Sequence, residues 1–195
     1  MLRLLPKIYT ADFYAKHKPW KRDYVAVARA LAQSIDFSSA LDLGCGNAYI
    51  AEELQEMGKV VRAIDGSDCA LEAMAPLIRQ RAILHDLTIP ITVGKFDLVI
   101  CTEVAEHLPA RSAQTLVKTI CSHFPQHVFF TAATPGQRGH FHLNEQPHSY
   151  WKLIFSDNGY VCNEALTESI QNKLSIRMKN ARWIARNTMI FVPCK

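Results

Sequence analysis

The chain has 195 residues, a formal net charge of +4 and 49% hydrophobic residues. That length suits one domain with a full core, and the moderate charge excludes an intrinsically disordered chain. No run of about 18 uncharged apolar residues occurs, so we expect no membrane-spanning helix and no membrane partner. The first ten residues, MLRLLPKIYT, lack the apolar core and cleavage site of a secretory signal.

Helix-like and strand-like segments alternate along the chain. Helices are predicted where apolar residues recur every three or four positions, and strands where short apolar or β-branched runs occur. The alternation predicts an α/β fold with an open, mostly parallel sheet and helices on both faces. Such sheets bind ligands beyond the carboxyl ends of their strands. The predicted helices are residues 24–35, 49–58, 67–74, 111–122 and 150–158, and the predicted strands are 40–43, 60–64, 81–84, 96–101, 127–131, 160–166 and 188–193.

A glycine turn, LDLGCG, follows the first predicted strand. A nicotinamide fingerprint needs a third glycine so that the helix can pack closely, but Tyr49 stands at that position. S-adenosylmethionine (SAM) has no pyrophosphate, and its amino-acid tail suits a strand-ending acid beside an open backbone. Asp42, Gly44 and Gly46 supply those features, so the turn favours SAM over NAD.

These residues resemble the class I SAM-dependent methyltransferases, whose hallmark is an apolar strand followed by Asp, an apolar residue and G-x-G. ALDLGCGNA matches that hallmark, with Ala48 where a third glycine is common. Because alanine is small, we expect little cost. The resemblance implies a single-domain Rossmann-like fold with a seven-stranded, mostly parallel sheet. It also implies that strand 188–193 lies antiparallel beside the fifth strand, and that residues 1–36 form a helical lid over a SAM-binding core, residues 37–195.

An acid also follows the second predicted strand. Asp65 lies about 20 residues beyond the turn, where a carboxylate can accept hydrogen bonds from both ribose hydroxyls. Ser67 is the better helix cap, which leaves Asp65 for that role. The resemblance implies that Asp86 and the amide of Leu87 serve the adenine. The cofactor-binding residues that follow are Asp42, Gly44, Cys45, Gly46, Asp65, Gly66, Asp86, Leu87 and Thr102.

The residues after the fourth predicted strand narrow the acceptor. Enzymes that methylate the exocyclic amines of nucleobases carry a D/N/S-P-P-aromatic stretch there, but this chain has TEVA, residues 102–105. Cys101 ends that strand without the proline that precedes many C5-methylating cysteines. Both classes are therefore disfavoured. KFDLVICTEVAEHLP resembles the family's fourth-strand motif, and the resemblance implies that Cys101, Thr102 and Glu103 line the mouth where methyl transfer takes place.

Two candidate catalytic clusters remain. In TEVAEHL, Glu103 and His107 are four residues apart and would share a helical face, with Glu106 exposed or ion-paired elsewhere. His107 is either a packing residue or a general base that contacts the substrate. The second cluster contains His140 and His142, which would point to one side of an extended chain.

These two histidines lie in a loop of about residues 134–150, which is long for an α/β connection. It is similar to stretches in uncharacterised bacterial class I methyltransferases, so we interpret it as the acceptor loop. A polar surface loop is the alternative. His140, His142 and Glu145 offer metal-ligand chemistry, but no second ligand pair is evident, so we expect no metal. The predicted catalytic residues are thus Glu103, His107, His140 and His142.

Aromatic residues gather near the start of the chain, where Tyr14, Trp20 and Tyr24 belong either to the lid or to the core. Basic residues gather near both ends, and we interpret them as solvated faces rather than contacts for an anionic partner. The six cysteines show no C-x-x-C spacing, which indicates free thiols in the cytoplasm.

The resulting hypothesis is a cytoplasmic SAM-dependent methyltransferase that releases S-adenosylhomocysteine (SAH). Its acceptor is predicted to be the oxygen or nitrogen of a small metabolite or natural-product intermediate. The alternatives are an RNA or protein methyltransferase that uses the basic ends, a regulatory subunit that binds SAM without transfer, and an NAD-dependent enzyme. Because the basic ends are interpreted as solvated faces, nucleic acid is a possible but disfavoured partner. The sequence indicates no oligomeric state.

Overall fold

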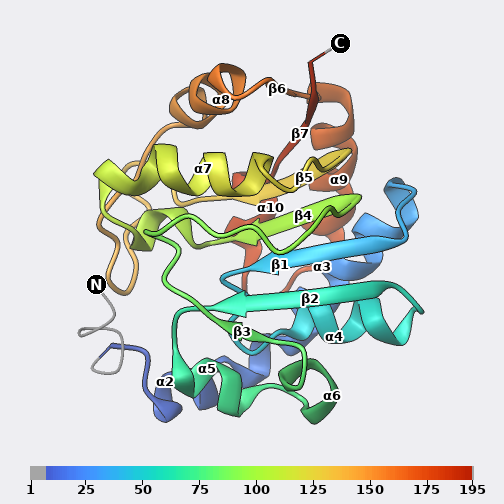
Figure 1. Ribbon diagram of the computed structural model, residues 1–195, viewed down its shortest axis with the longest axis vertical. Helices are drawn as coiled ribbons and strands as arrows, with labels where there is room; N and C mark the ends of the chain where they lie inside the picture. The colour runs from blue at the N-terminus through green and yellow to red at the C-terminus, as the bar shows by residue number, and fades with distance from the viewer. Residues whose placement is uncertain (1–7, 195) are drawn as a thin grey trace.

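A seven-stranded sheet forms the centre of the computed structural model, which describes residues 8–194 (Figure 1). Its strand order is β3-β2-β1-β4-β5-β7-β6, with β7 antiparallel to both of its neighbours and the other pairs parallel. The predicted α/β class and the antiparallel last strand beside the fifth are therefore confirmed. The strands are β1 (Ser39–Leu43), β2 (Val60–Asp65), β3 (Ile83–Leu84), β4 (Leu98–Thr102), β5 (His127–Thr131), β6 (Tyr160–Cys162) and β7 (Met189–Pro193).

Residues 1–7 and 195 lie outside the described residues. They include part of the predicted lid, part of the basic ends and most of the stretch that we searched for a secretory signal. In the described part of the chain, no helix has both the length and the apolar character needed to cross a membrane.

Helices cover both faces of the sheet, as Figure 1 shows for α7 on one side and α3 and α4 on the other. The strands divide their side chains between two apolar layers: Leu98 and Ile100 join the layer of α3 and α9, whereas Val99 joins that of α7 and α8. This alternation follows from the two-residue period of a strand. The helices are α2 (Ala11–His17), α3 (Lys21–Ser34), α4 (Tyr49–Glu56), α5 (Asp68–Ala73), α6 (Pro76–Arg79), α7 (Ala113–Cys121), α8 (His148–Asp157), α9 (Glu164–Arg177) and α10 (Arg182–Asn187), with short 3₁₀ helices at Lys18–Trp20, Ala105–His107 and Ala110–Ser112.

The prediction of a strand over residues 160–166 is wrong. Strand β6 ends at Cys162, and Asn163 then caps a helix, because its side chain accepts a hydrogen bond of 3.0 Å from the N–H of Leu166. Helices α9 and α10 were not predicted at all. Only a narrow stripe of α9 is buried, and its strongest local signal is the cap.

One buried carboxylate connects the N-terminal helix α3 to a turn near the C-terminus. Asp23 of α3 is fully buried and accepts hydrogen bonds from three successive N–H groups, those of Lys179, Asn180 and Ala181, at 3.0, 2.6 and 2.7 Å. These bonds join α3 to the turn between α9 and α10. Whether residues 1–36 act as a lid stays a prediction.

Candidate functional site

A cavity of about 550 Å³ lies beyond the carboxyl ends of β1, β2 and β4. A parallel sheet binds ligands at this edge, and the volume falls within the range of about 300–1,000 Å³ for small-molecule sites. Every residue that the sequence predicted for cofactor binding or catalysis lines this one cavity: Asp42, Gly44, Cys45, Gly46, Asp65, Gly66, Asp86, Leu87, Thr102, Glu103, His107, His140 and His142. The structure therefore brings them together, while their individual roles stay predictions.

The glycine turn is fixed by the neighbouring strand. The N–H groups of Gly44 and Cys45 both donate to the carbonyl of Ile64, at 2.7 and 3.1 Å. Gly44 has φ +72°, and a Cβ there would lie 2.3 Å from Cγ2 of Val104. Glycine is needed at this position for both its conformation and its small volume.

Ala48 stands where related turns often have a third glycine. We expected little energetic cost there because alanine is small, but the backbone conformation also matters. The residue is buried, with φ +57°, in the left-handed region that disfavours side chains. That conformation costs a non-glycine residue about 1–2 kcal/mol. The expected small cost thus holds for space but overlooks the backbone.

Asp65 connects the glycine turn to the loop after β2. Its carboxylate accepts hydrogen bonds from the N–H of Gly46 at 2.8 Å and of Ser67 at 2.9 Å. Burial raises the pKa of Asp65, and the backbone N–H groups oppose that shift. Each oxygen accepts one of these bonds and can accept another, and Asp65 lines the cavity, which is compatible with the predicted ribose contact.

The other predicted cofactor acids are also buried. Burial, with a further contribution from the charge of Asp65, raises the pKa of Asp42 to about 7. Asp86 holds its own loop, because Oδ1 accepts from the N–H of Thr88 at 2.9 Å and from its hydroxyl at 2.8 Å. Both acids are thus placed by the fold before any ligand binds.

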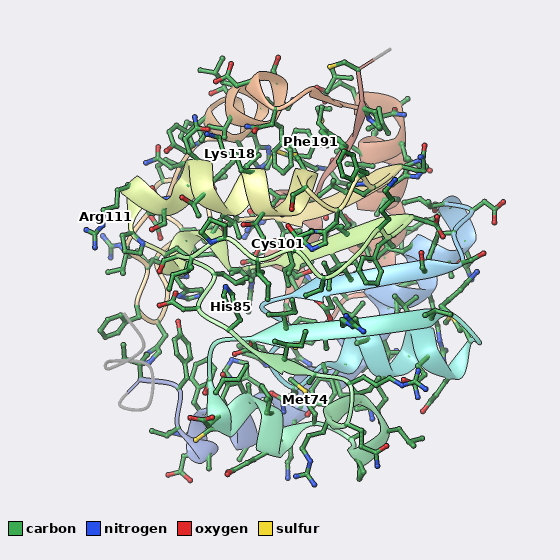
Figure 2. The ribbon with its side chains drawn as sticks, viewed as in Figure 1. Met74, His85, Cys101, Arg111, Lys118 and Phe191 are labelled. Atoms are coloured by element: carbon green, nitrogen blue, oxygen red, sulfur yellow. The ribbon has the colours of Figure 1, made fainter. Side chains whose placement is uncertain are left out.

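The end of β4 differs from the prediction. Cys101 is fully buried in the apolar layer between the sheet and α7 and does not line the cavity (Figure 2). Its side chain points to the interior because alternate residues of a strand face opposite layers. The cavity is lined instead by Thr102, whose buried hydroxyl has no hydrogen-bond partner among the described residues, and by Glu103.

Glu103 and His107 are not related by a helical turn. Glu103 has φ +53°, and its N–H donates to the backbone and side-chain oxygens of Thr131, at 3.1 and 2.9 Å. This turn precedes a single 3₁₀ turn at Ala105–His107. Asn187 of α10 donates to Oε1 of Glu103 at 3.0 Å, and burial raises the pKa of Glu103.

Glu106 was predicted to be exposed or ion-paired, and neither holds in the described part of the chain. Its side chain is fully buried, and Oε1 accepts a 3.3 Å hydrogen bond from the N–H of Ala133. Its carbonyl accepts from the N–H groups of Leu143 and Asn144, at 2.7 and 3.0 Å, which holds the acceptor loop against this segment. Burial, and then the nearby Glu103, raise the pKa of Glu106 well above its ordinary value.

His107 lies against the acceptor loop. Its Nδ1 is 3.3 Å from the carbonyl of Phe141, and its ring centroid is 5.0 Å from that of His142. Burial, together with His142, lowers the pKa of His107 to about 4. The imidazole is therefore neutral at pH 7, and its low basicity makes it a weak general base.

Glu145 organises the acceptor loop. Its carboxylate accepts from the N–H groups of Gly136 and Arg138, both at 2.8 Å, and from Nδ1 of His142 at 2.7 Å. The predicted extended backbone is wrong, since residues 140–141 form a turn and Phe141 has φ +62°. His142 is nevertheless half-buried in the cavity wall, whereas His140 is exposed.

Aromatic rings form another part of the cavity lining, which we call the aromatic wall: Phe13, His17, Trp20 and Trp183. Centroid distances of 4.1, 4.4 and 5.4 Å join Phe13 to His17, His17 to Trp20 and Trp20 to Trp183. Tyr14 lies both in the core and in the cavity lining. The lid and core interpretations of these rings are therefore not exclusive.

Comparisons with known proteins agree with this geometry. Residues 41–121 match the family model described as a methyltransferase domain. The magnesium protoporphyrin IX methyltransferase of Synechocystis, solved with bound SAH, superposes with a TM-score of 0.64 at 17% identity, over 88% of this chain and 81% of that one. The chain therefore has the fold of solved SAM-dependent methyltransferases, and its residues 41–121 match a methyltransferase domain.

Other solved methyltransferases share this fold. The sugar N-methyltransferase KedS8 from Streptoalloteichus has a TM-score of 0.68 at 12% identity, covering 95% of this chain and 93% of its own. The 1,6-didemethyltoxoflavin-N1-methyltransferase of Burkholderia thailandensis, with acceptor and SAH bound, has a TM-score of 0.67 at 14% identity, covering 99% and 88%. At these identities the likeness concerns the fold.

The curated relatives are longer proteins. The ubiquinone biosynthesis O-methyltransferase of Albidiferax ferrireducens is 33% identical over 91 residues, which are 40% of this chain and 36% of that protein. The protein of the same name from Acinetobacter baumannii is 31% identical over 124 residues, which are 56% and 46% of the two chains. The matched part of this chain therefore spans less than half the length of these relatives.

The sequence missed several residues that line the cavity. Phe13, His17 and Trp183 complete the aromatic wall, and Glu106 lies in its floor. The aromatic density of residues 9–24 could have indicated Phe13 and His17. Nothing local could have indicated Trp183, which comes from the helix that the pattern did not predict.

Proposed function

We propose that the chain transfers a methyl group from SAM to an oxygen or nitrogen atom of a small molecule and releases SAH. The observation that carries this proposal is the single cavity of about 550 Å³ at the carboxyl edge of the sheet. The predicted donor residues and the acceptor loop share its wall, so that both substrates would meet in one space. Such proximity and orientation can supply much of the catalysis of a methyl transfer.

The glycine turn and the loops after β2 and β3 form what we call the donor half of the cavity. This half would bind SAM through backbone and carboxylate groups. Gly44 and Gly46 line the cavity, where the turn would take the amino-acid tail, and Asp65 would accept from the ribose hydroxyls. Asp86 and Leu87 would contact the adenine from the loop after β3. The sulfonium would then lie near Thr102, where β4 ends.

The chemical step is an in-line displacement. The acceptor atom forms a bond to the methyl carbon, the bond from that carbon to sulfur breaks, and sulfur keeps the bonding pair as SAH. A hydroxyl acceptor must also lose its proton. The candidates to take it are the carboxylate of Glu103 and the imidazoles of His140 and His142.

The aromatic wall is evidence that the acceptor is flat and largely apolar. Rings of Phe13, His17, Trp20 and Trp183 face the cavity, and such rings stack on planar molecules. The names of the relatives and neighbours refer to quinone-precursor, sugar and toxoflavin methylation, which are small-molecule reactions of those proteins. A phenolic or heteroaromatic acceptor fits both sets of observations.

The test is product formation by the full chain. Incubation with SAM and a panel of phenols, catechols and aromatic amines should yield SAH and a product heavier by one methylene group, measured by mass spectrometry. SAM binding without product from any acceptor would favour a regulatory subunit. Binding of NAD that survives excess SAM would contradict the cofactor assignment.

An RNA acceptor is the second candidate, because Arg138 and Arg186 also line the cavity. Phosphate contacts make nucleic-acid affinity fall steeply with salt, by about 10³–10⁵ between roughly 50 and 200 mM for six to ten contacts. Methylation of RNA with this salt dependence would replace the small-molecule proposal. The cytoplasmic location stays a prediction that rests on six free cysteines.

A further inference from the structure

Glu106, His107 and His142 place three potential metal-ligating atoms within 4.8 Å of one another. They come from two segments, the 3₁₀ turn after β4 and the loop after β5. This set differs from the one considered from sequence, since His140 and Glu145 are not part of it. All three residues also line the cavity described above.

One oxygen of the buried Glu106 carboxyl group has no hydrogen-bond partner in the described part of the chain. The residue is fully buried, Oε1 accepts only the 3.3 Å bond from Ala133, and Oε2 has no hydrogen-bond partner among residues 8–194. None of the ion pairs in that part of the chain includes Glu106. Burying a carboxyl group is costly unless it is protonated, paired or bound to a metal, so the oxygen without a partner is a position that a cation could occupy in place of a proton.

The two imidazoles are oriented as metal ligands are. Nδ1 of His142 is 2.7 Å from the carboxylate of Glu145, and Nδ1 of His107 is 3.3 Å from the carbonyl of Phe141. Both partners only accept hydrogen bonds, so each Nδ1 donates, and each Nε2 is left to offer a lone pair to a metal. Metal-binding histidines have this same arrangement, with the second nitrogen donating to a carboxylate or carbonyl.

We propose that Glu106, His107 and His142 bind one divalent first-row transition-metal ion. Two imidazoles and one carboxylate suit Zn²⁺, and also Mn²⁺ or Fe²⁺, and leave coordination positions open. Because all three residues line the cavity, an oxygen of the acceptor could complete the coordination there.

The role of the ion rests on the proposed function, although the site itself does not. A hydroxyl bound to such an ion becomes more acidic, as water does. Its proton passes to water, the oxygen forms a bond to the methyl carbon, and the sulfur of SAM keeps the electron pair of the bond that breaks. The ion would therefore select oxygen acceptors over nitrogen acceptors, and His142 would act as a ligand.

The test uses the full chain, treated with a chelator and then titrated with Zn²⁺ or Mn²⁺ alone in a calorimeter. We expect saturable binding of one equivalent. Glu106→Gln and His142→Ala should weaken it by at least about 100-fold, and Glu145→Gln, which removes the partner of a ligand, by about 10–100-fold. His140→Ala removes an imidazole two residues from His142 in the same loop and should leave the affinity unchanged.

Two outcomes would overturn the site: no saturable binding to the wild-type chain, or equal affinity in the wild type and in both ligand variants. Thermal unfolding shows whether Glu106→Gln is folded, and His142→Ala, at a half-buried position, provides an independent variant. SAM affinity should be the same in both variants as in the wild type. Metal binding without any methyl transfer would leave the site standing and contradict the proposed function instead.

Discussion

The donor and acceptor halves of the cavity are held by different kinds of contact. In the donor half, the N–H groups of Gly44, Cys45 and Gly46 bind to strand β2 and its terminal Asp65, all within a short stretch of chain. In the acceptor half, side chains connect remote segments, as Asn187 does with Glu103 across 84 residues. The donor half is therefore a local structure, whereas the acceptor half depends on the whole fold.

Loss of His142 should give the largest effect and should separate the two halves. We expect His142→Ala to lower turnover by about 10²–10⁴-fold, the range for loss of proton-transfer or equivalent polar catalysis, while the SAM dissociation constant stays the same. His140→Ala should lower turnover less, because its exposed ring packs against Phe13 at 5.7 Å. Initial rates and calorimetry measure the two quantities. Full activity in both variants would contradict the role of the loop.

Gly44→Val should damage the donor half through both space and backbone. The new Cβ would meet Val104 at 2.3 Å in a residue with φ +72°. We expect a loss of about 2–5 kcal/mol in the free energy of unfolding, from overpacking and the left-handed conformation together. SAM binding should also weaken.

Gly58→Val is the matched control for that change. Gly58 has φ +81°, but a Cβ attached there would have no atom within 4 Å beyond its chain neighbours. Only the conformational cost of about 1–2 kcal/mol should remain, and SAM affinity should not change. Equal losses of unfolding free energy in the two variants, measured in urea, would show that Val104 does not restrict the turn.

Asp65→Ala should weaken SAM binding by about 1.5–3 kcal/mol, or ~10–150-fold, because a charged acceptor is lost. The change also releases the N–H groups of Gly46 and Ser67. Asp68→Ala, at an exposed position three residues later, should leave the affinity as it is. Calorimetry with SAM compares them, and an unchanged affinity in Asp65→Ala would remove the ribose assignment.

The last expected effect is a slope of stability with pH, which is small for any single step of one pH unit. Burial raises the pKa of Asp42 from 3.8 to about 7, so between these values the folded chain holds a proton that the unfolded chain has released. This contribution is complete below pH 3.8 and is lost as the pH rises through about 7, at up to ~1.4 kcal/mol per pH unit. Asp42→Asn should remove it. Urea unfolding at several pH values gives the free energy of unfolding of the wild type and of Asp42→Asn. If that free energy changed with pH equally in both proteins, the raised pKa of Asp42 would be contradicted.

The comparison also explains what the sequence could predict. The glycine turn, Asp65 and Asp86 each follow a strand in chain order, so their meeting at one edge follows from the parallel sheet alone. Glu106 was misplaced because its environment depends on the left-handed turn at Glu103 and on the arrival of Ala133 from the next strand. Neither event leaves a local pattern.

The carboxylate of Asp23 has a consequence for the order in which the chain is completed. Its partners, the N–H groups of residues 179–181, follow it by 156 to 158 positions. At about 5–20 residues per second of synthesis, they emerge from the ribosome roughly 8–30 s after Asp23. Until then Asp23 stays in water and Trp183 does not exist to meet Trp20. A nascent chain can thus form its glycine turn early, while its aromatic wall is closed only near the end of translation.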